Sequence, residues 1–273
     1  MLRATFLHLD TIGPATEALL WRQGVLDWKD LAAAAQIPNL SEERRRALLR
    51  DLDRSEQALA EQDVGWFTHR LPTSELWRLY PSFREVTAFL DIETTGLSPY
   101  EGIVTVVTVH GAGATRTFVA DDDLEELPAW LRRFKLLVSF NGRLFDVPFL
   151  ETRFPQLVVP VAHIDLRFVL YRLGLSGGLK RIEERLGIGG RTGVEGVRGL
   201  DAVRLWEEFR AGQTASLDRL VKYNRADTVN LEPLLELAVR ELTERLLGRR
   251  TSPEIRTNAA RPDALGSTFP SPS

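Results

Sequence analysis

The 273-residue sequence predicts an α/β protein with a small helical domain at its N-terminus, and three observations support this fold class. Residues 1–80 show only the apolar spacing of helices. Five later runs, rich in apolar and β-branched residues, have the length of strands: residues 86–92, 103–109, 115–119, 136–140 and 159–165. The last two runs alternate with segments of helical spacing, which is typical of α/β proteins.

The N-terminal segment is expected to form three helices, at residues 15–22, 28–36 and 41–61. The third begins with Ser41, a favourable N-cap residue, and continues with two glutamates that suit the first turn of a helix. Residues 9–25 resemble a helix-hairpin-helix element, which can present backbone N–H groups to a phosphate. The alternative is a small helical bundle whose core is formed by Trp21, Trp28 and Leu31.

Residues 81–247 are expected to form the sheet domain. A turn at Gly111-Ala112-Gly113 joins the second and third strands, so the sheet should begin with antiparallel pairs. Helices are expected at residues 124–134, from residue 144, and in a long pattern over residues 217–235. Residues 248–273 are rich in Pro, Ser and Thr with few large apolar residues, and we expect this tail to be disordered.

Composition restricts the class of protein. A hydrophobic content of 44% with 27% charged residues is typical of a soluble globular protein. No segment approaches the roughly 20 apolar residues of a membrane span, and the N-terminus lacks a signal-peptide core, so we expect a cytoplasmic protein without a membrane partner. The absence of cysteine excludes disulfides and thiolate catalysis. A formal net charge of −3 argues against indiscriminate coating of duplexes but allows nucleic-acid binding.

The most informative motif is Asp91-Ile92-Glu93, at the end of the first expected strand. Side chains alternate across a strand, so the two carboxylates share one face while Leu90 and Ile92 occupy the other. Like charges held this close repel each other and raise the pKa of at least one carboxyl group, unless a cation compensates. A divalent metal ion is the simplest compensation. A strand whose polar edge faces water would show the same pattern.

Two further segments carry candidate site residues. Asp146 follows a short strand that ends in the turn Asn141-Gly142, and it lies in the first turn of an expected helix, where an acid is also common as a favourable helix charge. Tyr223 and Asp227 are four residues apart in the long helical pattern and therefore share a face. Taken alone, each could be an ordinary solvated residue.

Together, Asp91, Glu93, Asp146, Tyr223 and Asp227 resemble, in order and local context, the three motifs of the DEDD (DnaQ-like) superfamily of 3′–5′ exonucleases. The resemblance covers residues 84–245. It implies a ribonuclease H-like fold, in which a central mixed sheet is flanked by helices and the acids gather at one end. A tyrosine four residues before the last aspartate is typical of the tyrosine branch of this superfamily.

The chain is also similar to the YprB-type family of ribonuclease H-like nucleases. Four short segments carry this similarity: Ser139-Phe140-Asn141-Gly142, His163-Ile164-Asp165-Leu166, residues 178–183 and residues 223–227. That family often has histidine at the position of Tyr223. Whether Tyr223 is essential or a replaceable group that orients water therefore stays open.

The resemblance implies two divalent ions, Mg²⁺ or Mn²⁺, which suit hard oxygen ligands and support phosphodiester hydrolysis. Asp91 would bridge both ions, Glu93 and Asp227 would complete the site that activates water, and Asp146 would hold the other ion largely through water. Tyr223 would orient the attacking water, because a phenol with a pKa of about 10 is a poor base at neutral pH.

The residues after the first motif are candidates for substrate binding. Thr94, Thr95 and Gly96 are small and could expose backbone N–H groups to a terminal nucleotide, although they could equally form only a strand-ending turn. Leu97 would wedge against the terminal base, as in similar exonucleases. Asn141 could contact substrate, although an Asn-Gly pair is more often only a turn with positive φ.

Three other polar residues near these motifs are expected to be structural. Asp165 follows an apolar run and is expected to cap a helix. His110 and His163 are expected at strand ends, because neither has a partner at the spacing of metal ligands.

The sequence thus leads to the hypothesis of a metal-dependent 3′–5′ exonuclease that acts on ends of single-stranded DNA or RNA and releases nucleoside 5′-monophosphates. The exonuclease polarity comes from the resemblance. A structure-specific endonuclease with the same carboxylates is one alternative. A non-catalytic nucleic-acid-binding protein that retains the fold is another, and the presence of all four acids counts against it.

Overall fold

The computed structural model describes residues 1–34, 41–157, 159–160, 162–190, 193–194, 196 and 199–248. The tail expected to be disordered lies outside the described residues from position 249 onward. The last two residues of the helix expected at 28–36 also lie outside them.

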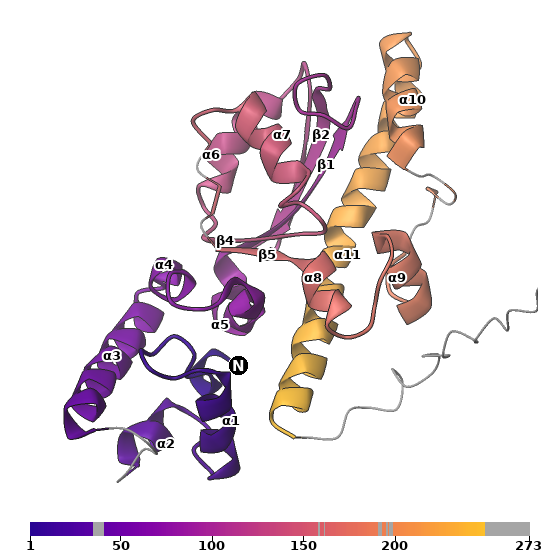
Figure 1. Cartoon of the computed structure of the whole chain (residues 1–273). Coiled ribbons are helices and arrows are strands. Elements are labelled where there is room, and N and C mark those ends of the chain that lie inside the picture. Colours follow the sequence, from indigo (N-terminus) through magenta and orange to yellow (C-terminus); the bar gives the residue numbers. More distant parts are fainter. Residues whose placement is uncertain are drawn as a thin grey trace, which may run out of the picture.

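A five-stranded mixed sheet forms the centre of the protein, as predicted (Figure 1). Its strands are β1 (Thr87–Thr94), β2 (Val104–Gly111), β3 (Ala114–Val119), β4 (Leu136–Ser139) and β5 (Ala162–Asp165). They lie in the order β3-β2-β1-β4-β5, with β1, β2 and β3 antiparallel and with β4 parallel to both β1 and β5. The expected antiparallel start is correct because Ala112 and Gly113, both at positive φ, form a two-residue hairpin turn between β2 and β3.

Helices cover both faces of the sheet (Figure 1). On one face, Ala88, Leu90 and Ile92 belong to the same buried apolar cluster as residues of α6 (Leu127–Leu131) and α7 (Asp146–Arg153). On the other face, Phe89 belongs to a second buried cluster that includes residues of α11 (Thr214–Leu246). Because side chains alternate along β1, Asp91 and Glu93 point to the same face as Phe89, toward α11.

The helix expected at residues 124–134 is shorter than predicted. A 3₁₀ turn, η4 (Leu124–Glu126), precedes α6, which ends at Leu131. Pro128 explains the break, because a proline lacks an N–H donor and is favoured in the first turn of a helix. The remaining helices of this part are α8 (Leu166–Tyr171), α9 (Leu179–Leu186) and α10 (Gly199–Arg210).

The N-terminal part is helical, as predicted. Its elements are η1 (Leu2–Ala4), α1 (Pro14–Arg22), α2 (Trp28–Ala33), α3 (Glu42–Ala60), α4 (Val64–Thr68), η2 (Thr73–Leu79), α5 (Tyr80–Phe83) and η3 (Arg84–Val86). Ser41 caps α3, since its hydroxyl accepts a hydrogen bond from the backbone N–H of Arg44. Trp28 and Leu31 are buried in the core, while Trp21 packs against it in a partly buried position.

A buried ion pair holds this helical part together. Arg78 donates to Glu17 at 2.9 Å, and both side chains are almost fully buried. Glu17 also accepts hydrogen bonds from the hydroxyl of Thr5 and the backbone N–H of Phe6, both at 2.7 Å. The loop before α1 is therefore tied to η2 by a fully satisfied polar network.

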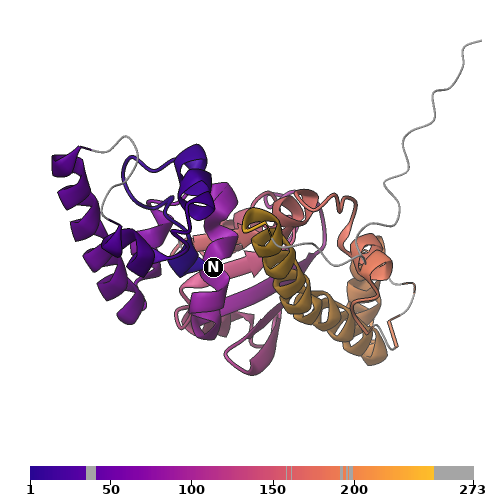
Figure 2. The same ribbon diagram turned by 90° about the horizontal axis from the view of Figure 1, so that it is seen from below.

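The helical part packs directly against the sheet. Its buried apolar residues belong to one cluster with Phe89, Val138 and Ile164, which lie on strands of the sheet. Seen from below, its helices lie at one end of the sheet, whereas α10 lies at the other (Figure 2). A domain boundary at residue 80 stays a prediction. Among the described helices, none has both the length and the apolar composition needed to cross a bilayer.

Candidate active site

Three carboxylates from distant parts of the chain meet between β1 and α11. Asp91 and Glu93 leave the same face of β1, and Asp227 comes from α11. Each residue has one carboxylate oxygen that lies within 4.8 Å of a carboxylate oxygen of each of the other two. This spacing allows the three side chains to share a metal ion.

The carboxylates line a cavity of about 860 Å³, which we call the acidic cavity. Every site residue expected from the sequence lines it: Asp91, Glu93, Thr94, Thr95, Gly96, Leu97, Asn141, Asp146, Tyr223 and Asp227. The structure therefore brings the whole expected set to one place. The catalytic and binding roles of these residues stay predictions.

The end of β1 sets the position of Glu93. The register of the β1–β2 pair shifts between Glu93 and Thr94, so that Thr105 becomes an extra residue on β2. The hydroxyl of Thr105 donates to the carbonyl oxygen of Glu93 at 3.0 Å. The register shift thus ends the regular pairing of β1 with β2 at the edge of the cavity. The bond from Thr105 holds the backbone of Glu93, which carries the carboxylate.

A tight turn sets the position of Asp146. Asn141 adopts a φ of 67°, as expected for an Asn-Gly turn, and a Cβ atom at Gly142 would collide with the side chain of Ser139. Asp165 holds this turn by accepting a hydrogen bond from the N–H of Asn141 at 2.8 Å. It also caps α8 through the N–H of Arg167, so the expected capping role of Asp165 is confirmed.

Asn224 is a site residue that sequence reasoning missed. Its side-chain amide donates to Oδ2 of Asp91 at 2.8 Å, and the residue is fully buried. It lies three residues before Asp227 on α11 and therefore shares the face of Tyr223 and Asp227. The signal was present in the sequence as a polar residue on the helix face that carries the other candidates.

Crowding of acids in a buried site perturbs their ionisation. Burial raises the pKa of Asp91 and Glu93 well above their usual values, and repulsion by neighbouring carboxylates, chiefly Asp146 for Asp91 and Asp227 for Glu93, raises it further. Burial raises the pKa of Asp146 to about 7, although backbone N–H groups, including that of Ile92, oppose the shift. Ionisation of all these carboxyl groups at once is therefore unfavourable in the absence of a cation.

This electrostatic strain fits a site for a hard cation. All the acidic donors are carboxylate oxygens, the ligands that Mg²⁺ and Mn²⁺ prefer. Oδ1 of Asp146 is buried and makes no hydrogen bond within the described part of the chain. His110 and His163 do not line the acidic cavity, since His110 bonds Thr115 and Glu232 and His163 bonds Ser139.

The surroundings of Tyr223 favour the protonated form of its phenol. Burial, followed by the charges of Asp227, Glu93 and Asp91, raises the pKa of its phenol further above the usual value. Nζ of Lys180 lies 4.2 Å from the centre of its ring, close enough for a cation–π contact that limits ring movement. Tyr223 is thus held with its proton attached at the edge of the acidic cluster.

The loop after β1 uses several of its polar groups internally. The hydroxyl of Thr94 donates to the carbonyl oxygen of Gly96, and the N–H of Thr95 donates to the carbonyl oxygen of Ile103. The backbone N–H of Thr95 is therefore already paired. Leu97 is 86% exposed at the rim of the acidic cavity. Sequence reasoning missed six further lining residues: Ile92, Phe140, Phe145, Val203, Arg204 and Glu207.

A family model described as the RNase_H superfamily matches residues 88–239. That range contains all five residues of the expected catalytic set and the described strands, except for Thr87, the first residue of β1. No curated protein sequence matches the chain.

Three solved structures show similarity to the chain. One is the family B DNA polymerase from the hyperthermophilic archaeon Pyrobaculum calidifontis, with 19% identity and a TM-score of 0.44 over 59% of this chain and 27% of that chain. Another is the apo form of a nuclease, with 18% identity and a TM-score of 0.43 over 66% of this chain and 80% of that chain. The third is the catalytic core of RRP6 from Trypanosoma brucei, with 15% identity and a TM-score of 0.40 over 64% of this chain and 47% of that chain. The chain thus spans about a quarter of the polymerase and about half of the RRP6 core.

Proposed function

Because this chain belongs to the RNase H superfamily, we propose that it is a metal-dependent 3′–5′ exonuclease that removes nucleoside 5′-monophosphates from single-stranded DNA or RNA ends. The observation that carries the proposal is the approach of the Asp91, Glu93 and Asp227 carboxylates within 4.8 Å, in a cavity that Asp146 and Tyr223 also line. A phosphodiester is an anion, so such a site suits it only with cations bound.

The side chains of the acidic cavity have distinct roles in this proposal. Two divalent ions would activate water and neutralise the phosphoryl and leaving oxygens. The carboxyl group of Asp91 interacts electrostatically with both Asp146 and Glu93, which would suit it to hold both cations. Glu93 and Asp227 would hold one of them, and Asp146, whose Oδ1 has no hydrogen-bond partner in the described chain, would hold the other.

Tyr223 would orient the attacking water. Its raised pKa keeps the phenol protonated at neutral pH, so the hydroxyl can donate a hydrogen bond but cannot accept the proton of the water. The neighbouring carboxylates are the groups of the chain that can receive that proton. Tyr223 also supports assignment to the tyrosine branch of the DEDD superfamily.

The finer assignments are part of the same proposal. Membership of the YprB-type family rests on the four sequence segments around the site. The choice of Mg²⁺ or Mn²⁺ rests on the all-oxygen donor set. The cytoplasmic location stays a prediction from composition.

The test is incubation of 5′-labelled single-stranded DNA and RNA with Mn²⁺ and with either the wild type or Asp91→Ala. The proposal requires a ladder that shortens from the 3′ end with the wild type and no ladder with the variant. Asp10→Ala, which removes an exposed acid outside the cavity, is the matched control and should cleave like the wild type.

Other outcomes separate the alternatives. Internal cuts would identify a structure-specific endonuclease that uses the same carboxylates. Binding of the oligonucleotides without metal-dependent turnover would indicate a protein that retains the fold for binding only. Cleavage by Asp91→Ala at the wild-type rate would show that hydrolysis does not take place in the acidic cavity.

A further inference from the structure

Exposed apolar side chains are frequent in the segments that follow the parallel strands of the sheet. In the described part of the chain, seven large apolar residues are exposed. Six of them follow the carboxyl ends of the three parallel strands: Leu97, Tyr100 and Ile103 after β1, Leu144 after β4, and Phe168 and Tyr171 after β5. Single exposed apolar residues are normal on a protein surface, but a group of them marks a binding surface. The carboxyl ends of parallel strands are also where open α/β sheets bind ligands.

A second cavity lies beside the acidic cavity at this edge. Its volume is about 720 Å³, within the roughly 300–1,000 Å³ typical of ligand sites. Phe140 and Asn141 line both cavities, so the two adjoin where β4 ends. The second cavity is otherwise lined by α8 and the residues leading into α9, and we call it the α8 cavity.

The two cavities have opposite charge. None of the described residues that line the α8 cavity is acidic, whereas five carboxylates line the acidic cavity. Arg167 lines the α8 cavity, is exposed, and donates to Oδ1 of Asn141 at 2.5 Å, at the junction of the cavities. Within the described chain, no carboxylate lies at ion-pair distance from Arg167. The guanidinium is therefore available to a ligand phosphate at the point where a strand would enter the acidic cavity.

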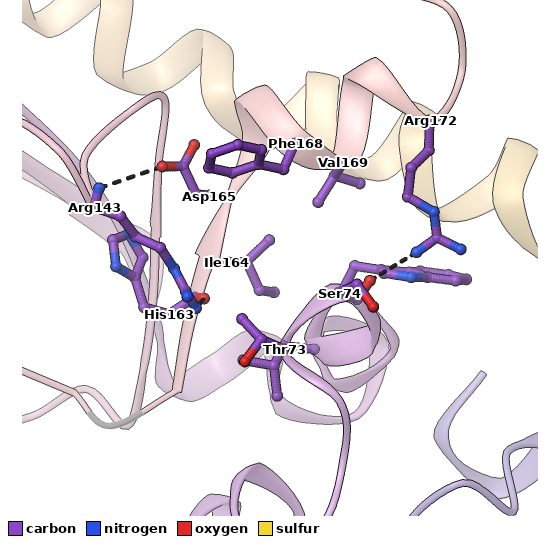
Figure 3. Close-up of a pocket in the computed structure, with 11 residues that line it drawn as sticks. Thr73, Ser74, Arg143, His163, Ile164, Asp165, Phe168, Val169 and Arg172 are labelled. Carbon is purple, nitrogen blue, oxygen red and sulfur yellow. Dashed lines mark hydrogen bonds between the residues drawn. The ribbon is translucent and has the colours of Figure 1, made fainter. Parts of the chain in front are cut away.

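Two aromatic rings stand on a firmly anchored helix. Phe168 and Tyr171 are 52% and 70% exposed, and both line the α8 cavity. Their helix is capped by Asp165 and buries Leu170 in the core. At its end, Arg172 donates to the carbonyl oxygen of Ser74 at 2.7 Å (Figure 3). Arg172 also pairs with Glu75 at 3.0 Å. The helix that carries the rings is thus held in place before any ligand binds, which lowers the entropy lost on binding.

Phe168 forms a wall of the α8 cavity. A smaller cavity of about 330 Å³ lies at the junction with η2, and Phe168 lines it together with Ile164 and Val169 (Figure 3). Phe168 thus lies between this smaller cavity and the α8 cavity and lines both of them. Flat aromatic rings in such positions suit stacking with nucleobases of any sequence.

We propose that the α8 cavity binds the nucleotides that precede the cleaved end of a single-stranded nucleic acid, with bases stacked on Phe168 and Tyr171 and a backbone phosphate beside Arg167. This inference rests on the proposed function, because it takes the acidic cavity as the site of cleavage. Stacking on side chains requires unpaired bases, so the α8 cavity selects single strands over duplex. DNA and RNA share this chemistry, and both are used in the test.

The test measures binding separately from cleavage. Fluorescence anisotropy of labelled 10-nucleotide DNA and RNA strands is recorded with the full chain in Ca²⁺, for the wild type and for Phe168→Ala/Tyr171→Ala. Loss of one stacked base corresponds to at least about a fivefold rise in Kd, and Arg167→Ala should reduce the salt dependence of binding. Leu26→Ala is the matched control, because Leu26 is 51% exposed but lies in the helical part, away from both cavities. Circular dichroism melting confirms that each variant is folded.

Hydrolysis of the p-nitrophenyl ester of thymidine 5′-monophosphate by the wild type in Mn²⁺ distinguishes this inference from the proposed function. That ester has no nucleotide before the cleaved bond, so it tests the acidic cavity alone. The double variant should bind a blunt duplex like the wild type. Equal affinities of the wild type and the double variant for the 10-nucleotide strands overturn the α8 cavity as a binding site, whatever the cleavage results. Absence of Mn²⁺-dependent hydrolysis by the wild type instead overturns the proposed function. Failure of the wild type to bind any single strand overturns both.

Discussion

The side-chain amide of Asn224 donates a hydrogen bond of 2.8 Å to Oδ2 of Asp91, although the two residues are 133 positions apart. This bond fixes the orientation of the central carboxylate and lowers its pKa against the effect of burial. Asn224 is fully buried, and its replacement by alanine would remove this donor from Asp91. The pair links α11 to β1 inside the candidate metal centre.

Asn224→Ala should weaken Mn²⁺ binding by about 10–100-fold, the usual effect of losing a partner that orients a metal ligand. Isothermal titration calorimetry measures the change. Asn230→Ala is the matched control, because Asn230 lies on the same helix and bonds the buried Glu183 at 3.0 Å, away from the acidic cavity. Equal Mn²⁺ affinities in both variants would show that Asn224 does not orient a metal ligand.

Mn²⁺ should raise the melting temperature of the wild type and leave that of Asp227→Asn nearly unchanged. A ligand that binds only the folded state stabilises it by about 2.7 kcal/mol at a hundred times its Kd. Asp227 is one of the three carboxylates that meet within 4.8 Å, so its loss should remove most of this gain. Thermal melting with and without Mn²⁺ checks the prediction, and equal shifts in both proteins would contradict it.

Asp146→Asn should stabilise the metal-free protein, and the gain should grow with pH. Burial raises the pKa of Asp146 to about 7 in the folded state, against about 3.9 in an unfolded chain. Between these values the folded state binds more protons than the unfolded state, so the contribution of Asp146 to stability is complete below about pH 4 and is lost as pH rises through about 7. Asparagine cannot ionise and escapes this loss.

Urea unfolding in EDTA from pH 4.5 to 8 measures the difference between Asp146→Asn and the wild type. It should be small at the acidic end and reach a few kcal/mol, as an order of magnitude, at the alkaline end. Asp10→Asn, an exposed site, provides the baseline. A difference that does not vary with pH would show that Asp146 ionises normally.

Tyr223→Phe should reduce kcat by the same factor at every pH from 7 to 9.5. The phenol stays protonated over this range because burial and the neighbouring carboxylates raise its pKa. A factor of about 10²–10⁴ would indicate proton transfer in the transition state, so we expect a smaller loss for a residue that only orients water. Tyr80→Phe is the control, since Tyr80 is a buried phenol that donates to Glu232, outside the acidic cavity. An inflection of the wild-type rate that disappears in Tyr223→Phe would identify Tyr223 as a base.

Arg78→Met should destabilise the protein by about 3–5 kcal/mol, because it leaves the buried carboxylate of Glu17 without its cation. Arg3→Met removes the exposed pair with Glu56 and should cost less than about 1 kcal/mol. Urea unfolding compares the two variants. Similar values would mean that the network around Glu17 does not hold the helical part together.

Much of the fold follows from short-range patterns. The five strands, the turn at Ala112 and Gly113, and the N-cap at Ser41 depend on residues within a few positions of one another, and the structure confirms them. The 3₁₀ start of the helix near residue 124 was missed because apolar spacing does not register the effect of Pro128 on the chain before it.

By itself, the sequence determined which candidate side chains share a face. Alternation along β1 places Asp91 with Glu93, and helical spacing places Tyr223 with Asp227. Only the tertiary structure decided that these two faces meet, that Asn224 bonds Asp91, and that Phe168 and Tyr171 open onto a cavity beside the acids. The reason is physical: backbone geometry repeats over a few residues, whereas contacts between distant segments depend on how whole helices and the sheet pack to bury their apolar faces.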